Sequence, residues 1–145
     1  MNWKREAANE LTELLSYKRA IRNMEERIQM LTEQMKATRS PTISDEPGGR
    51  SGVRQVDDAW LDAIGERDRL KIKLSAKRKH VALIERGLSA LTEEERTVLT
   101  LFYIDRPRDH LNVLCEKLGV EIATVYRMKD AALRKYAREE FGGEM

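Results

Sequence analysis

Two long stretches of chain with an apolar residue at every third or fourth position constrain this fold more than any other feature. Residues 2–38 contain neither proline nor glycine. Their apolar stripe alternates steps of three and four positions: Leu14, Tyr17, Ile21, Met24, Ile28, Leu31 and Met35. This heptad spacing is typical of a helix that buries one narrow face against a partner helix. It predicts a first long helix over residues 1–38.

The heptad pattern stops at residues 39–54, which read RSPTISDEPGGRSGVR. Two prolines, three glycines and three serines fall in this stretch. These residue types favour turns and interrupt helices and strands. We therefore predict a flexible loop over residues 39–54.

The heptad pattern returns after this loop and predicts a second long helix over residues 55–90. Its apolar positions are Val56, Trp60, Ala63, Leu70, Leu74, Val81, Ile84, Leu88 and Leu91. Two helices of matched length joined by one loop favour an antiparallel hairpin, which would place Trp60 near Leu31 and Met35. A coiled coil between separate chains is the alternative that the pattern leaves open.

Composition supports an all-α protein and excludes several classes of site. The 145 residues are 36% charged and only 6% aromatic, which argues against a β-sandwich. A single cysteine, Cys115, excludes an internal disulfide framework and a cysteine-built zinc site, and it is expected to be a small core residue. His80 and His110 are far apart in the chain and are expected to be exposed or to cap helices. We predict no catalytic site, no cofactor and no metal site.

The charge distribution bears on location and partners. The net charge is +2, so nucleic-acid binding must depend on a local site rather than on the whole surface. Charges are scattered through the first residues, and no later stretch approaches the length and hydropathy of a membrane span. We expect a cytoplasmic protein that does not associate with membranes.

Residues 91–142 change spacing and predict a separate domain of short helices. Thr92 and Glu95 form a capping-box pattern that starts one helix. A short helix then ends at Leu118, and Gly119 is well placed to terminate it. A final helix is expected from about Glu121 to Glu140. Two helices joined by a tight glycine turn predict a helix-turn-helix, with valines packed in its corner.

The motifs around this turn resemble those of a known family. They are Leu118-Gly119-Val120, Thr124-Val125-Tyr126-Arg127 and Ala132-Leu133. This string resembles region 4 of sigma-70-type factors and the LuxR-like output domains. The whole layout resembles the ArpU and RinA-type phage regulators, in which a helical segment precedes a sigma-like helix-turn-helix. The resemblance implies a phage or prophage transcriptional regulator of late genes that binds double-stranded DNA, with host RNA polymerase as a further partner.

The outward residues of the second helix of this motif are the candidate DNA contacts. They are Ile122, Ala123, Thr124, Tyr126, Arg127, Lys129, Asp130 and Arg134. Arg127 is the best candidate for a base contact, and Lys129 and Arg134 for phosphate contacts. The segment from Asp109 onward has six basic and seven acidic residues, so we expect tight binding to need a homo-oligomer or polymerase.

A run of basic residues on the second long helix has two interpretations. Its members are Arg67, Arg69, Lys71, Lys73, Lys77, Arg78, Lys79 and Arg86. The first interpretation is a phosphate-contacting arm centred on Lys73, Lys77 and Arg78. The second, which we favour, is a solvated face that pairs with glutamates of the first helix. These glutamates are Glu6, Glu10 and Glu13.

Two other functions compete with transcription regulation. A small terminase-like DNA-packaging subunit also joins a helix-turn-helix to a helical hairpin, although there the DNA-binding part usually comes first. A protein–protein interaction module that has lost DNA binding would explain the acidic balance of the C-terminal segment.

Overall fold

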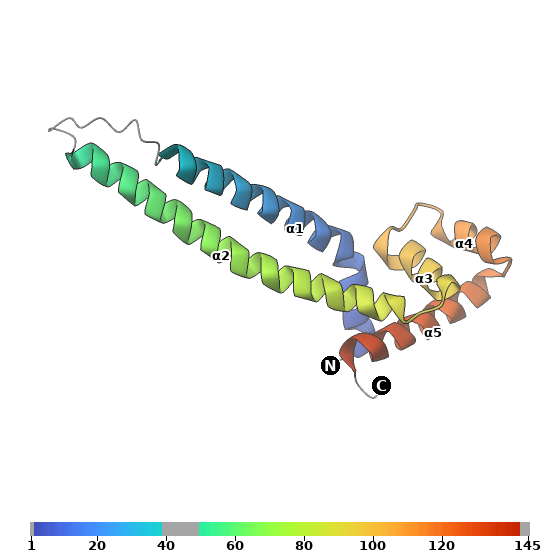
Figure 1. The fold of residues 1–145 in the computed structure, drawn as a ribbon. Helices are drawn as coiled ribbons and strands as arrows, with labels where there is room; N and C mark the ends of the chain where they lie inside the picture. Colours follow the sequence, from blue (N-terminus) through green and yellow to red (C-terminus); the bar gives the residue numbers. More distant parts are fainter. Residues whose placement is uncertain (1, 39–49, 143–145) are drawn as a thin grey trace. The chain divides into compact units, whose positions relative to one another are not determined.

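All the elements of the described structure are helical. The computed structural model describes residues 2–38 and 50–142, with side chains from residue 58 onward in the second stretch (Figure 1). The helices are α1 (Trp3–Thr38), α2 (Arg50–Ser89), α3 (Glu93–Leu99), the π-helix η1 (Thr100–Ile104), α4 (His110–Leu118) and α5 (Ile122–Phe141). No strand occurs in these two stretches, so the prediction of an all-α protein is confirmed. None of these helices combines the length and the apolar character that crossing a membrane requires.

The start of α2 differs from the sequence-based prediction. We predicted a loop over residues 39–54, but α2 begins at Arg50. The helix extends back through Gly52, a residue that costs about 1 kcal/mol in a helix interior but is tolerated near an end. The remaining residues of the predicted loop, 39–49, lie outside the described part of the chain.

The chain divides into two compact units, and the division cuts through both long helices. The terminal unit combines Met1–Lys18 with Lys79–Met145, and the middle unit is Arg19–Arg78. The short C-terminal helices therefore share a unit with the start of α1 and the end of α2.

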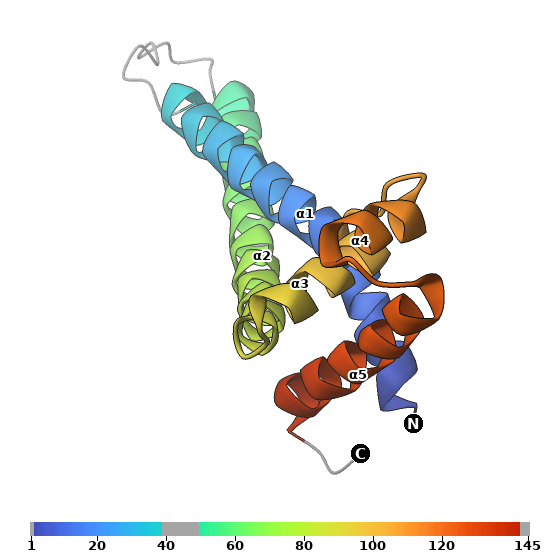
Figure 2. The same ribbon diagram turned by 90° about the vertical axis from the view of Figure 1, so that its right-hand side faces the viewer.

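In the middle unit, α1 and α2 run side by side in opposite directions (Figures 1 and 2). Leu31 and Met35 of α1 are buried against Ala63 of α2, and Trp60 packs on this cluster as the heptad register predicted. Ion pairs between exposed side chains join the helices at Arg27–Glu66, 3.0 Å, and Arg78–Glu25, 2.8 Å.

The core of the terminal unit contains fully buried large side chains from each of its helices except η1. These are Leu11 of α1, Ile84 of α2, Val98 and Leu99 of α3, Leu114 of α4, and Val125 and Tyr136 of α5. Helix α5 packs against α4, α3 and the start of α1 (Figure 2). Between α5 and α3, Lys135 pairs with Glu95 at 3.0 Å.

Gly87 allows α5 to approach α2 closely. A Cβ atom at this position would lie 2.8 Å from Cε2 of Tyr136, which is closer than van der Waals contact permits. Since Tyr136 is fully buried, its ring has little freedom to move away. The glycine is therefore required by the packing and not by the backbone conformation, because α2 continues to Ser89.

The predicted capping box is present at the start of α3. The Thr92 N–H donates to Oε1 of Glu95 at 2.9 Å, and the Glu95 N–H donates to the Thr92 hydroxyl at 3.2 Å. The hydrogen bond from the Thr92 backbone, helped by Lys135, lowers the pKa of Glu95 despite partial burial. This cap fixes where the last part of the chain leaves α2.

Candidate nucleic-acid interface on α5

The turn between α4 and α5 is set by one residue in the left-handed region. Gly119 has φ = 65°, and its N–H donates to the carbonyl of Cys115 at 2.9 Å. A residue with a Cβ is strained at this φ, so glycine is favoured here. Val120 and Glu121 complete the turn before α5 begins at Ile122. The Glu121 side chain makes no capping hydrogen bond, as expected for glutamate at a position where serine is usual.

The corner between α4 and α5 is filled by apolar side chains. Val125 is fully buried against Leu114 of α4 and against Val98 and Phe102. Val120 packs on the same cluster from the turn. Cys115, which we expected to be a small core residue, is half-buried and packs against the cluster. This packing fixes the rotation of α5 about its own axis, and so determines which residues face outward.

Most residues in the first turns of α5 around Val125 are exposed. Ile122 and Tyr126 are 48% and 44% exposed, and Ala123 and Arg127 are also exposed. Arg134 is exposed two turns further on, and at 100° per residue it shares the outward side with Ala123 and Arg127. The structure thus places five of the eight predicted contacts on one accessible face, whereas Thr124 is half-buried.

Lys129 is already paired within the protein. Its Nζ lies 2.9 Å from Oδ1 of Asp130 and 5.3 Å from the centroid of the Phe102 ring, and its side chain is only 17% exposed. Burial alone would lower its pKa, but hydrogen bonds to Asp130 and Tyr103 leave the pKa raised. Asp130 also pairs with Lys4 at 3.2 Å. Lys129 is therefore a poor candidate for a phosphate contact, and the structure favours Arg127 and Arg134.

A cluster of aromatic rings packs against the first turns of α5. The Phe102 ring of η1 meets Tyr126 edge-on, with centroids 5.8 Å apart, and meets His110 at 4.9 Å. We expected His110 to be exposed or to cap a helix, but it is buried because its ring packs on Phe102. Burial, together with the nearby Arg106, lowers its pKa, so His110 is neutral at pH 7.

The three residues at the centre of the predicted phosphate arm on α2 differ in exposure and pairing. Arg78 pairs with Glu25 of α1, Lys77 is half-buried, and Lys73 is exposed without an ion pair to any described residue. Pairing with α1 therefore occurs, but at Glu25 rather than at the three glutamates that we named. Glu10, one of those three, instead faces His80 at 3.5 Å.

The sequence patterns did not predict one group of neighbouring side chains. Glu10, His80 and Glu140 come from three helices that are distant in the chain, and they converge in the terminal unit. Burial, and then the neighbouring Glu10, raise the pKa of Glu140 to about 7. No spacing rule connects residues so far apart, so only the packing of α1, α2 and α5 reveals the group.

Comparisons with models of protein families, with curated proteins and with solved structures give no match to this chain.

Proposed function

We propose that this protein is a sequence-specific DNA-binding regulator of transcription. In this proposal α4 and α5 form a helix-turn-helix, and the first turns of α5 enter the major groove. The observation that carries it is the alternation around Val125. This residue anchors α5 in the core, while Ile122, Ala123, Tyr126 and Arg127 are left exposed at the end of the helix that a groove admits.

The charge on this face indicates that a single copy binds weakly. Arg127 and Arg134 are its exposed cations among the predicted contacts, whereas Lys129 is neutralised by Asp130. Each phosphate neutralised by a cation adds to affinity, and few are available here. We therefore include a second copy of the chain, or the RNA polymerase of a bacterial host, as the partner that makes binding tight.

The resemblance to ArpU and RinA-type regulators supplies the biological setting of the proposal. The proposal is accordingly that a phage or prophage encodes the protein and that it acts on late genes. The long α1–α2 hairpin would then serve as the element through which copies associate.

Recovery of bound DNA tests this proposal directly. Full-length protein is mixed with fragmented genomic DNA of its source at low salt, and the retained fragments are sequenced. We expect one short motif to be enriched, and enrichment to fall when the salt concentration is raised. Retention of fragments without a common motif would contradict sequence-specific binding.

One observation favours a second candidate, a protein–protein interaction module. Ile122 and Tyr126 expose apolar surface on a segment whose charge is slightly acidic, which suits a protein partner better than a phosphate backbone. This candidate predicts that no genomic DNA is retained at any salt concentration.

A further inference from the structure

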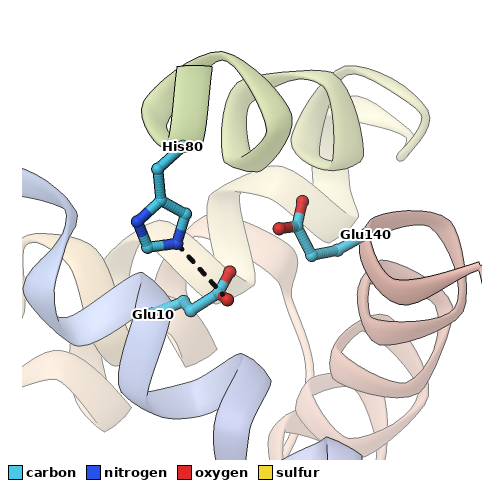
Figure 3. A group of neighbouring side chains, drawn as sticks. All are labelled: Glu10, His80 and Glu140. Carbon is cyan, nitrogen blue, oxygen red and sulfur yellow. Dashed lines mark ion pairs between the residues drawn. The ribbon is translucent and has the colours of Figure 1, made fainter. Parts of the chain in front are cut away.

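Three helices of the terminal unit bring one imidazole and two carboxylates together (Figure 3). Glu10 comes from α1, His80 from α2 and Glu140 from α5. Each offers one potential metal ligand, and these ligand atoms all lie within 4.8 Å of one another. The pair closest to ligand geometry is His80 Nε2 and Glu10 Oε1, which are 3.5 Å apart.

A side-chain hydrogen bond joins Glu140 to Glu10, but one carboxylate oxygen of this group is left without a partner. Oε2 of Glu140 is buried and has no hydrogen-bond partner among the described residues. Arg86 is the nearby cation that lowers the pKa of Glu140, but no ion pair joins the two side chains. A buried carboxylate oxygen without a partner is costly, and a second carboxylate beside it adds repulsion. A bound cation would remove both costs.

Contacts made by Tyr17 and Tyr136 position the ligands and the helices that carry them. The Tyr17 ring lies 5.1 Å from the His80 ring, and Tyr136 packs closely over Gly87. The Tyr136 hydroxyl donates to Oε2 of Glu10 at 3.3 Å, which leaves Oε1 directed at His80. Such a hydrogen bond to the second oxygen of a ligating carboxylate is common in metal sites and orients the ligand.

We propose that Glu10, His80 and Glu140 bind one divalent transition-metal ion, with Zn²⁺ as the best fit. One imidazole and two carboxylates are zinc ligands, and water would complete a four-coordinate shell. Zinc–ligand bonds of 2.0–2.2 Å place neighbouring ligand atoms about 3.3 Å apart. The His80–Glu10 separation already matches this value, and rotation of the Glu140 side chain would bring in the third ligand.

The ion would cross-link three helices and would be separate from the proposed DNA-reading face. Glu140 lies near the C-terminal end of α5, about 27 Å along the helix axis from Ile122 at 1.5 Å per residue. The ion would tie α5 to α1 and α2 and so stabilise the terminal unit. Its effects are therefore measured as binding and thermal stability, independently of whether the protein binds DNA.

Calorimetric titration with ZnCl₂ tests the site in the full-length chain. The protein is freed of any histidine tag, treated with EDTA and exchanged into a buffer that does not chelate. We expect one ion per chain, a Kd in the micromolar range or below, and a higher melting temperature with zinc. MgCl₂ should bind at least tenfold more weakly, because magnesium disfavours imidazole.

Matched variants assign the ligands. His80→Gln and Glu140→Gln should each weaken zinc binding at least tenfold and abolish the zinc-dependent rise in melting temperature. Glu139→Gln is the control, because Glu139 is the exposed neighbour of Glu140 on α5. It should bind zinc as the unaltered protein does.

Two results would overturn the site. One is the absence of one-to-one zinc binding by the unaltered protein at concentrations up to millimolar. The other is an unchanged Kd in His80→Gln and Glu140→Gln. If either variant loses its helical circular dichroism, Glu10→Gln replaces it, with exposed Glu13→Gln as control. The absence of zinc binding by the unaltered protein overturns the site whatever the variants do.

Discussion

The terminal and middle units are built from the same two long helices, yet they bury their apolar residues differently. In the middle unit each helix has one partner, and its buried apolar residues are Leu31, Met35, Ala63 and Leu74. In the terminal unit the same helices meet α3 and α5 as well, and fully buried side chains come from five helices. A heptad stripe is thus sufficient to pair two helices. Bringing Glu10, His80 and Glu140 together requires further helices packed against that pair.

Matched leucine truncations on α1 should show the largest difference between the units. Leu11 is fully buried in the terminal unit, and Leu31 is buried in the middle unit. We expect Leu11→Ala to lower the free energy of unfolding by about 4–5 kcal/mol and Leu31→Ala by about 2–3 kcal/mol. The reason is that two helices can close over a cavity more easily than a multi-helix core can.

Urea denaturation followed by circular dichroism measures both values. Equal losses in the two variants would show that the middle unit is packed as rigidly as the terminal unit.

Identical glycine substitutions should have opposite signs in the two units. Gly87→Ala places a Cβ 2.8 Å from the Tyr136 ring and should cost about 1–3 kcal/mol. Gly65→Ala meets only Nη1 of Arg69, at 3.6 Å, and should stabilise α2 by up to about 1 kcal/mol through helix propensity. Melting temperatures of the two variants test this. If Gly87→Ala stabilised the protein, α5 would not be in close contact with α2 at this position.

The capping box should make the terminal unit sensitive to acid. Thr92→Ala removes the hydroxyl that accepts from Glu95 N–H and should cost about 1 kcal/mol. The lowered pKa of Glu95 means that its carboxylate stabilises the fold fully above about pH 4.5. This contribution is lost as pH falls through the folded pKa.

This effect is isolated by measuring the free energy of unfolding at pH 7 and pH 3.5. At each pH the gap is the difference between the unaltered protein and Glu95→Gln. We expect the gap between the two proteins to narrow at pH 3.5. A gap that widens in acid would contradict the sign of the shift.

The ion pairs of the middle unit should contribute least. The side chains of Arg27 and Glu66 are 49% and 41% exposed, and surface ion pairs contribute about 0.2–1 kcal/mol. A double-mutant cycle with Arg27→Ala and Glu66→Ala should give a coupling energy in this range that falls at 0.5 M salt. A coupling above about 2 kcal/mol would show that this pair, rather than the apolar seam, holds the two helices together.

Local chemistry made part of this structure predictable from the sequence. The heptad stripe placed Trp60 beside Leu31 and Met35, the Thr92–Glu95 spacing gave the cap, and Gly119 gave the end of α4. Each of these depends on residues close in the chain or on one repeating pattern.

The features that could not be predicted depend on which individual side chains pair or pack together. Pairing removed Lys129 from the set of candidate DNA contacts, because Asp130 and a ring from η1 surround its charge. Packing on Phe102 buried His110. Glu140 meets Glu10 and His80 close to the point where Gly87 lets α5 approach α2. No periodicity within a single helix encodes such meetings.

Discrimination between DNA sequences by the start of α5 is tested most directly with two arginine variants. Arg127 is exposed beside the anchored Val125, and Arg138 is exposed near the other end of the same helix. Affinities of the full-length protein are measured for the motif recovered from genomic DNA and for a scrambled duplex, at one fixed salt concentration. We expect Arg127→Ala to reduce the preference for the motif by about 1–3 kcal/mol, and Arg138→Ala to leave it unchanged. An unchanged preference in Arg127→Ala, or an equal loss in both variants, would contradict recognition by the start of α5.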